Sequence, residues 1–532
     1  MNNVMPIAYR GMIASPHYLA SSVGNRMLQQ GGNAFDAAVA VSAALAAVYP
    51  HMTGLGGDAF FLVYDAALGK LRGFNGSGRS GRRVTPALFA REGLDAIPKR
   101  GVRSAITVPG MVDAWWEVWS AYGQLPWEQL LEPAIRYTEE GVPVSRDLHR
   151  WIVKDQPLLM EQEIHARTFL PHGAPLAIGE RLMQPELAAT LKQVRDGGRE
   201  VFYEGELMRR IVQGLQRDGG WLEEEDFRSH RGEWTDPIST TYRSRTVVQM
   251  PPNSQGFSVL QMLNMLENEE LDRVPRHSAD FYHLAAEVVK QAFRDRDAYL
   301  TDPRFSPIPL ERLLSKEHAR AQYRSIRMAW PDGVSFASKA MGQDTAYAAA
   351  VDEEGNAVSF IQSLYFDFGS VYTPGDTGIM LQNRGSFFSL DPNEVNVLAP
   401  GKRTFHTLMP GMVLEGGKPC LLVGTQGGEG QPQTQLSLLT GVLDYGCSVQ
   451  EAIALPRWVY GRTWGDDSDL LRMENRGLDQ AAIRDLQARG HRVELLGPWD
   501  PVVGQAQAIK IHPDGSFSGA ADPRGDGLAI GW

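Results

Sequence analysis

Two long apolar runs separated by a polar turn constrain the fold more than any other feature of this chain. Residues 345–351 and 357–365 are both strand-like, and the polar residues 352–356 lie between them. Turn residues between two apolar runs predict a β-hairpin. With the turn centred on its third residue, Thr345 lies opposite Ser363, unless a bulge shifts the pairing by one residue. A serine hydroxyl in that position could hydrogen-bond the threonine side chain.

The segments before this hairpin alternate between helical and strand patterns. Residues 18–30 and 34–48 predict helices, and Asn33 is a suitable N-cap for the second one. Residues 59–64 and 70–74 predict strands. After the hairpin, short strand-like runs separated by glycine, proline and aspartate are expected to continue to Pro432.

A glycine-rich loop follows one of these later strands. Residues 421–423 read as a buried strand that runs into Gly424-Thr425-Gln426-Gly427-Gly428-Glu429-Gly430. Consecutive glycines let backbone N–H groups approach a ligand closely, as an oxyanion hole requires. Taken in isolation, the loop is better interpreted as a flexible turn.

The balance of charges and the two cysteines exclude several classes of partner. The chain has 52 basic and 63 acidic residues, a net charge of −11, and no basic tract, so nucleic-acid binding is not expected. Cys420 and Cys447 cannot supply a four-ligand zinc site, and we predict neither a metal nor a cofactor. The most apolar stretch, residues 34–49, is shorter than the ~20 residues of a membrane span. No secretory signal is visible at the N-terminus, so we expect a cytoplasmic protein.

Several motifs along the chain resemble the γ-glutamyltransferase family of N-terminal nucleophile hydrolases. They are Gly31-Gly32-Asn33-Ala34, Pro50-His51, Gly54-Leu55-Gly56-Gly57, Pro251-Pro252-Asn253-Ser254-Gln255-Gly256, Thr345-Ala346-Tyr347 and Asp522-Pro523-Arg524. The resemblance covers nearly the whole chain and implies an α+β fold, the four-layer αββα sandwich of that family. It also implies self-cleavage between Asp344 and Thr345, just after a small, polar loop at residues 335–343. Residues 1–344 and 345–532 would then be two chains of one shared domain.

The resemblance assigns the chemistry to four residues. Cleavage would leave Thr345 with a free α-amine, whose pKa of roughly 7.7–8.0 lets it accept the hydroxyl proton near neutral pH. Ser363 matches the hydroxyl that bonds the nucleophile, and Gly427 and Gly428 match the paired glycines of the oxyanion hole. The large and small chains are expected to stay associated, with further oligomerisation left open.

The positions that bind the substrate differ from the family's pattern. The arginine that binds the α-carboxylate is replaced by Asn75, and the aspartate that pairs with the amine is replaced by Phe387. The other positions around this headgroup are Tyr365, Arg384, His406 and Thr407. Loss of a negative charge together with the added Arg384 suits a substrate that has a carboxylate but no ammonium group. An internal ion pair is the alternative for Arg384.

Further strings resemble oxamate amidohydrolases within this family, and glutathione-hydrolase-like proteins share many of them. They include Tyr49-Pro50-His51-Met52, Gln382-Asn383-Arg384-Gly385, Phe405-His406-Thr407-Leu408 and Gly430-Gln431-Pro432-Gln433-Thr434-Gln435. We therefore predict an amidohydrolase that acts on a small-molecule amide through an acyl-enzyme intermediate. A γ-glutamyltransferase or glutathione hydrolase is the first alternative. An inactive binding relative is the second, and the joint presence of all four catalytic residues disfavours it.

Overall fold

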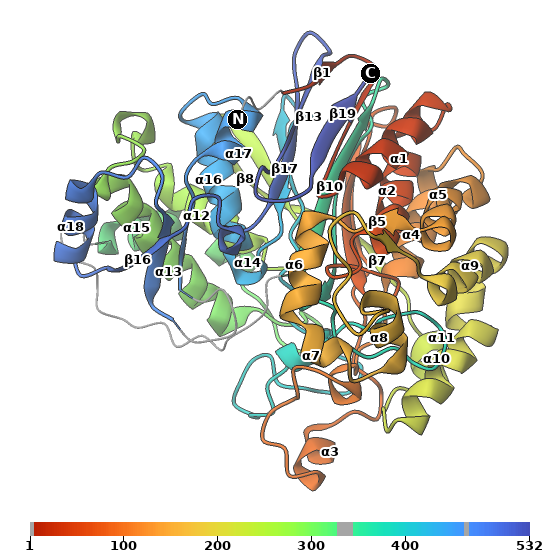
Figure 1. The fold of residues 1–532 in the computed structure, drawn as a ribbon. Helices are drawn as coiled ribbons and strands as arrows, with labels where there is room; N and C mark the ends of the chain where they lie inside the picture. The colour runs from red at the N-terminus through yellow and green to blue at the C-terminus, as the bar shows by residue number, and fades with distance from the viewer. Residues whose placement is uncertain (1–4, 327–343, 462–467) are drawn as a thin grey trace.

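The computed structural model describes residues 5–326, 344–461 and 468–532 of the chain. The loop predicted at residues 335–343 lies outside these residues. Two seven-stranded sheets face each other at the centre of the molecule, and helices cover the outer face of each one (Figure 1). This arrangement is the α+β, four-layer αββα sandwich that the resemblance implied, and that prediction is confirmed.

The first sheet contains the predicted hairpin at its centre. Its strand order is β19-β2-β10-β11-β3-β4-β7, with every pair antiparallel. The strands are β2 Gly11–Ser15, β3 Asp58–Asp65, β4 Lys70–Asn75, β7 Glu233–Thr235, β10 Asp344–Asp352, β11 Ala357–Tyr365 and β19 Leu528–Gly531. Strands β10 and β11 are the predicted hairpin. Four strands of this sheet, β2, β3, β4 and β7, precede Thr345 in the sequence, and the other three contain or follow it.

The second sheet follows the order β1-β18-β17-β13-β12-β9-β8 and is also antiparallel throughout. The strands are β1 Ile7–Ala8, β8 Ile238–Tyr242, β9 Arg245–Gln249, β12 Gly411–Glu415, β13 Lys418–Thr425, β17 Ala506–Ile511 and β18 Phe517–Ala521. Strand β13 carries the buried run predicted before the glycine loop.

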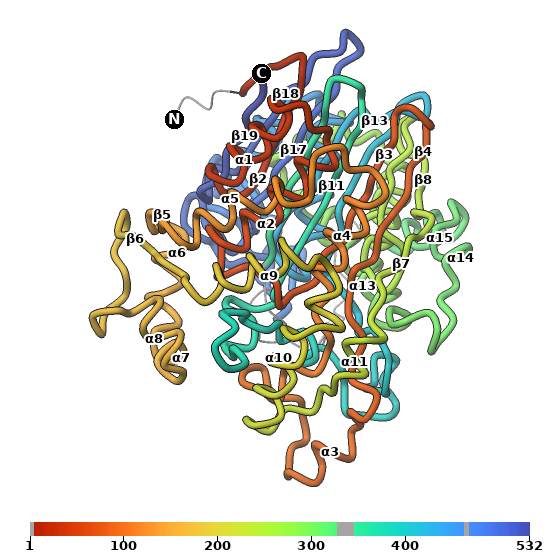
Figure 2. Tube along the Cα trace, turned by 90° about the vertical axis from the view of Figure 1, so that its right-hand side faces the viewer, coloured from red at the N-terminus to blue at the C-terminus, as the bar shows by residue number. Residues whose placement is uncertain are grey.

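Two groups of helices form the outer layers. The helices on the first sheet, which Figure 2 shows in front of its strands, are α1 Tyr18–Gln29, α2 Ala34–Val48, α4 Met111–Tyr122 and α5 Trp127–Glu140, with α9 Pro185–Tyr203 and α10 Glu206–Arg217 beside them. The second sheet is covered by α12 Phe257–Leu266, α13 Ala279–Tyr299, α16 Gln431–Leu443 and α17 Val449–Ala454. Every residue of α2 is buried, and Asn33 and Asp36 form a capping box at its N-terminus.

The remaining elements lie around these layers. They are α3 Pro86–Arg91, α6 Arg146–Lys154, α7 Gln156–Leu159, α8 Glu163–Phe169, α11 Glu224–Arg228, α14 Leu310–Leu313, α15 Lys316–Ser325, α18 Gln480–Ala488, β5 Val142–Pro143, β6 Arg181–Leu182, β14 Trp458–Tyr460, β15 Leu470–Glu474 and β16 Arg492–Leu496. The expectation of short, interrupted strands between the hairpin and Pro432 is confirmed for β12 and β13 but was wrong for residues 366–410. Residues 366–410 form turns, isolated bridges and the short 3₁₀ helix η3, Arg384–Phe387, because their glycines, prolines and polar residues interrupt any ladder.

The hydrophobic core has three layers: one between each sheet and its helices, and one between the two sheets. Alternate residues of β10 face opposite ways: Ala348 packs with the helices on the first sheet, and Tyr347 packs between the two sheets. Strand β11 does the same with Phe360 and Ile361. Because strand side chains alternate with a period of two, both faces of the hairpin are buried. This burial holds the Thr345 end of β10 in a single register.

Candidate active site

Thr345 lies in a bulge at the beginning of β10. The pairing of β10 with β11 follows the predicted register from Ala346, opposite Gln362, to Val351, and shifts by one residue between Asp344 and Ala346. Asp344 therefore pairs with Tyr365. A bulge redirects the side chain at the extra residue. Thr345 is 1% exposed, and its Oγ1 accepts a hydrogen bond from the side-chain nitrogen of Gln431 at 3.5 Å.

Ser363 lies on the strand next to the nucleophile and is fully buried. Its Oγ accepts a hydrogen bond from the backbone N–H of Tyr365 at 2.7 Å. Tyr365 has a φ of 88°, a conformation that costs energy for a residue with a side chain and that is found most often at functional sites. The hydrogen bond between the hydroxyls of Thr345 and Ser363 stays a prediction.

The glycine loop connects β13 to α16. Gly427 and Gly428 have φ values of 129° and 50°, which glycine adopts without a steric penalty. Neither of their backbone N–H groups has a hydrogen-bond partner within the described part of the chain, although both residues are buried. Two unused N–H donors in a buried loop are what an oxyanion hole needs.

A set of buried polar side chains forms hydrogen bonds with this loop. The Gln255 side-chain nitrogen donates to the carbonyl oxygens of both Gly428 and Thr407, each at 3.0 Å. Arg296 of α13 donates through Nη1 to the Gln255 side chain at 3.3 Å and through Nη2 to Glu429 at 2.7 Å. Gln255 thus joins the glycine loop to the segment that holds the predicted substrate-binding residues.

Arg384 is the most unusual charged residue of the site. It is 1% exposed, and its Nη1 donates to the Thr407 hydroxyl at 3.3 Å. Its guanidinium carbon lies 4.3 Å from the ring centre of Tyr365 and 5.8 Å from that of Phe387. Within the described ranges, its Nε and Nη2 have no hydrogen-bond partner, and no carboxylate forms an ion pair with it. Burial lowers the pKa of Arg384 to about 10, against the opposing effects of Tyr365 and Asp58, so the side chain is still charged at neutral pH.

Asp58 and His406 form a buried pair near this arginine. The Asp58 Oδ1 accepts hydrogen bonds from the backbone N–H groups of Gly78 at 3.2 Å and Gly110 at 3.1 Å. His406 Nδ1 accepts from a backbone N–H at 3.3 Å, so the ring proton is on Nε2, which lies 3.2 Å from Asp58 Oδ2. Burial raises the pKa of Asp58 to about 6, while the charge of Arg384 opposes that rise. Burial also lowers the pKa of His406 well below its usual value, so the ring is neutral.

Asn75 lies at the end of β4 and is used within the protein. Its side-chain nitrogen donates to the Asn253 side chain at 2.8 Å, and its side-chain oxygen accepts from the backbone and the hydroxyl of Ser77. The backbone of Asn253 in turn accepts from His406 N–H at 2.8 Å. Both polar ends of the Asn75 side chain are therefore engaged within the protein.

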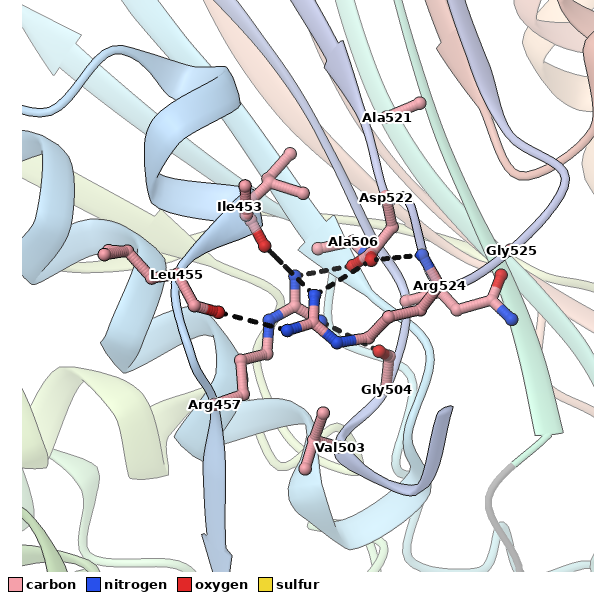
Figure 3. A network of polar contacts seen from close by, with 12 residues as sticks. Ile453, Leu455, Arg457, Val503, Gly504, Ala506, Ala521, Asp522, Arg524 and Gly525 are labelled. Atoms are coloured by element: carbon pink, nitrogen blue, oxygen red, sulfur yellow. Dashed lines mark hydrogen bonds and ion pairs between the residues drawn. The ribbon is translucent and has the colours of Figure 1, made fainter. Parts of the chain in front are cut away.

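A second group of buried arginines lies behind the glycine loop. Arg524 contacts Glu474 through Nη2 at 2.6 Å and Asp522 through Nη1 at 3.0 Å. Arg457 contacts Asp522 at 2.5 Å and donates to the carbonyl of Gly504 at 2.8 Å (Figure 3). A side chain at Gly427 would come within 3.5 Å of Gly504. This network therefore holds one border of the glycine loop in place.

The structure brings the predicted residues together in two connected groups. Thr345 and the glycine loop form one group, and Arg384, Tyr365, Thr407 and His406 form the other. They meet at two points, the pairing of Asp344 with Tyr365 and the Gln255 side chain.

Two residues of the site were not identified from the sequence, Asp58 and Gln431. Asp58 could have been noticed because it is a charged residue directly before the apolar run at 59–64. Gln431 was noticed only as part of a family-like string.

One cluster elsewhere has a composition that could hold a metal. Within the described ranges it is the one group of three potential ligands, namely His283, Glu287 and His491, all buried. The Lys290 ammonium lies 2.6 Å from the Glu287 carboxylate and neutralises it, and the two imidazoles lie within hydrogen-bond distance of each other at 2.8 Å. A protein cation in this place competes with a metal ion. Among the described helices, none is long and apolar enough to cross a membrane.

Comparison with known proteins agrees with this geometry. The family model described as Gamma-glutamyltranspeptidase matches residues 20–532. The glutathione hydrolase-like YwrD proenzyme of Bacillus subtilis is 54% identical over 529 residues, which cover 99% of this chain and 100% of that protein. The oxamate amidohydrolase proenzyme of Klebsiella pneumoniae is 38% identical over 535 residues, which cover 99% of each protein.

Solved structures show the same relationship. Cephalosporin acylase from Bacillus halodurans superimposes with a TM-score of 0.91 at 35% identity, covering 100% of this chain and 97% of that one. The gamma-glutamyltranspeptidase of Helicobacter pylori gives a TM-score of 0.57 at 29% identity over 63% of this chain and 94% of that one. The chain therefore belongs to the gamma-glutamyltranspeptidase family and, like the hydrolases and acylases among its relatives, is an enzyme.

Proposed function

We propose that this enzyme is a self-processing amidohydrolase that cleaves the amide of a small carboxylate substrate of the oxamate type. In processing, Thr345 Oγ1 attacks the carbonyl carbon of Asp344, and the peptide C–N bond breaks as its nitrogen takes a proton. Water then hydrolyses the resulting ester. The products are residues 1–344 and 345–532, and the second chain begins with a free α-amine. The two chains stay associated because each main sheet takes strands from both.

The same threonine then acts on the substrate. Its α-amine accepts the hydroxyl proton, and Oγ1 attacks the amide carbonyl of the substrate. The N–H groups of Gly427 and Gly428 hold the negative oxygen, and the proton moves to the leaving ammonia. Water hydrolyses the acyl-enzyme ester and regenerates Thr345. For oxamate, the products of one cycle are ammonia and oxalate.

The observation that carries this proposal is the buried Arg384, whose Nε and Nη2 nitrogens have no hydrogen-bond partner among the described residues. A guanidinium can hold a carboxylate through two parallel hydrogen bonds, and removal from water makes such a pair strong. The ring of Tyr365 lies against the guanidinium, and the backbone of Tyr365 pairs with the residue before the nucleophile. A small acid held by Arg384 would thus present its amide near Thr345.

The neighbours of Arg384 have supporting roles in this proposal. Thr407 orients the guanidinium through its hydroxyl, and Tyr365 and Phe387 cover the charge with ring faces. His406 and Asn75 act through Asp58 and Asn253, respectively, because their own polar atoms are engaged within the protein. An apolar Phe387 would leave the ammonium of a γ-glutamyl headgroup without a partner.

Hydrolysis of γ-glutamyl compounds is the second candidate. It is favoured by the 54% identity with a relative named as glutathione hydrolase-like. This candidate requires another group to bind the substrate ammonium, because Phe387 cannot.

Intact-mass measurement and substrate competition together test the proposal. Wild-type protein should separate into two chains cut before Thr345, and Thr345→Ala should remain a single chain. Processed enzyme should have a higher kcat/KM for oxamate than for γ-glutamyl-p-nitroanilide or glutathione. A tenfold advantage for a γ-glutamyl compound would favour the second candidate, and cutting of Thr345→Ala at the same bond would remove Thr345 from the mechanism.

A further inference from the structure

Gln431 differs from the two other glutamines that follow it on the same helix. Gln433 donates to the carbonyl of Tyr460 at 2.9 Å and accepts from its N–H at 2.7 Å. Gln435 donates to the carbonyl of Met409 at 2.5 Å and accepts from the Gln249 side chain at 2.8 Å. All three glutamines have buried side chains. Gln433 and Gln435 thus use both ends of the side-chain amide, as buried amides in folded proteins do.

Gln431 uses only one end of its amide. Its nitrogen lies 3.5 Å from Thr345 Oγ1, and its oxygen has no hydrogen-bond partner within the described part of the chain. Gln431 is the first residue of α16 and directly follows the short 3₁₀ turn Gly428–Gly430, so the glycine loop determines where its side chain lies. An unused amide oxygen in a buried position next to the nucleophile indicates a group that binds there in another state of the protein.

Cleavage before Thr345 would create such a group. In the uncut chain the nitrogen of Thr345 belongs to a peptide bond and has one hydrogen. After cleavage it is an amine, which carries two hydrogens when neutral and three when protonated. The amine and the hydroxyl of one threonine lie close together, so an amide that contacts the hydroxyl can reach the amine with its other end.

We propose that Gln431 is a positioning residue for Thr345, whose side-chain nitrogen donates to the hydroxyl oxygen and whose side-chain oxygen accepts from the new α-amine. This inference rests on the proposed cleavage before Thr345. The two contacts would fix the side-chain rotamer of Thr345 and hold its amine beside its own hydroxyl. An acceptor also stabilises the protonated amine, so Gln431 would contribute to the pH at which the amine becomes a base.

The test replaces Gln431 with side chains that should change the pKa of the Thr345 α-amine in opposite directions, and it measures that pKa directly. Processed wild-type, Gln431→Glu and Gln431→Leu are labelled with acetic anhydride across a range of pH, and mass spectrometry of the N-terminal peptide of residues 345–532 reports the fraction acetylated. A carboxylate beside the amine favours its charged form, so Gln431→Glu should raise the pKa of the amine by about one unit. Gln431→Leu should lower it. The acid limb of kcat/KM for oxamate should move in the same directions.

Gln433→Glu is the matched control, since it places the same charge two residues away on the same helix. It should destabilise the protein without moving the pKa of the Thr345 amine. If Gln431→Glu leaves that pKa unchanged, or if Gln433→Glu shifts it equally, the inference is wrong.

The rate of self-cleavage provides a second measurement that does not need a processed variant. Gln431→Leu should fold with a normal circular dichroism spectrum but cleave more slowly than wild-type, because the donor to Thr345 Oγ1 is lost. Gln433→Leu should cleave at the wild-type rate. Wild-type cleavage kinetics in Gln431→Leu would overturn the donor role. A wild-type chain that stays uncut would instead contradict the proposed function.

Discussion

Two sets of buried arginines differ in what faces them. Arg524 meets Glu474 and Asp522 at 2.6 and 3.0 Å, and Arg457 shares Asp522 with it. Arg384 is just as buried, but its one hydrogen-bond partner among the described residues is the Thr407 hydroxyl. Two aromatic rings also lie against it, and the Asp58 carboxyl acts on it only from a distance.

In the proposed function, this difference separates arginines that stabilise the fold from one that binds the substrate. A guanidinium loses its hydration when it is buried, and a facing carboxylate offsets that loss. For Arg524 and Arg457 the offset comes from within the protein. For Arg384, contacts within the protein offset only part of the lost hydration, and the carboxylate of a bound substrate would offset the remainder. We therefore expect changes at the first set to affect stability and changes at Arg384 to affect binding.

The largest effect is expected at Glu474, which lies in the structural network. Removing one partner of a buried ion pair costs about 3–5 kcal/mol, so Glu474→Gln should lower the free energy of unfolding by that amount. Urea denaturation in a Thr345→Ala background, where the chain stays whole, measures it. The opposite result, an altered KM with normal stability, would break the distinction between the two sets.

The pH dependence of the same variant has a defined sign. The pKa of Glu474 is lowered in the folded protein, because the charges of Arg524 and Arg476 outweigh the effect of burial. The stability from this pair is therefore present above pH 4.5 and is lost as the pH falls through the lowered value. Wild-type and Glu474→Gln should accordingly become more alike in stability below pH 4.5, as urea titrations at several pH values would show.

The next effect concerns Arg384 and should appear in binding. Loss of a buried, charge-assisted contact costs roughly 2–5 kcal/mol, so Arg384→Gln should raise the KM for oxamate by about a hundredfold. Self-cleavage should proceed normally, because it does not involve this group. Stability should stay within about 1 kcal/mol of wild-type, since the variant also removes a buried charge without a carboxylate partner. Arg384→Lys keeps the charge but loses the planar fork, and an intermediate KM is expected. Unchanged KM in both variants would place the anion elsewhere.

The smallest effect is a pH dependence set by Asp58. Its carboxyl has a pKa of about 6 in the empty site, so it gains its charge as the pH rises from 5 to 7. That negative charge lies close enough to Arg384 to compete with a substrate carboxylate for its positive charge. The KM for oxamate should therefore fall roughly threefold or more as the pH drops from 7 to 5. Asp58→Asn should remove this dependence, and a persistent slope in that variant would assign the titration to another group.

Elements with a strong local signal could be predicted from the sequence. The buried helix α2 and the β10–β11 hairpin are both confirmed, and the predicted register holds from Ala346 to Val351. The shift at Thr345 could not be assigned, because it depends on the pairing of Asp344 with Tyr365 and on the positive φ of Tyr365. Neither property has a signature in the neighbouring residues.

Residues whose partners are distant in the sequence were harder to identify. Asp58 joins the site through β3, which pairs with β11. No local pattern links those two segments. The same applies to Arg384, for which an internal ion pair and a free cation are equally compatible with the sequence. The Asp58 carboxylate affects the pKa of Arg384 through its charge. Only the folded chain shows that Asp58 pairs with His406 and forms no ion pair with Arg384.

Strand β10 lies in the interior of its sheet, between β2 and β11, and this position would make maturation a one-way event. The intact chain folds as a single molecule. After the proposed cut, β10, β11 and β19 would belong to one polypeptide and their neighbours β2 and β3 to the other. Recovery from denaturation would then require an encounter between two chains, each of which lacks the strands that cover its apolar edges. The mature enzyme would therefore persist because unfolding is slow, and not because it can refold.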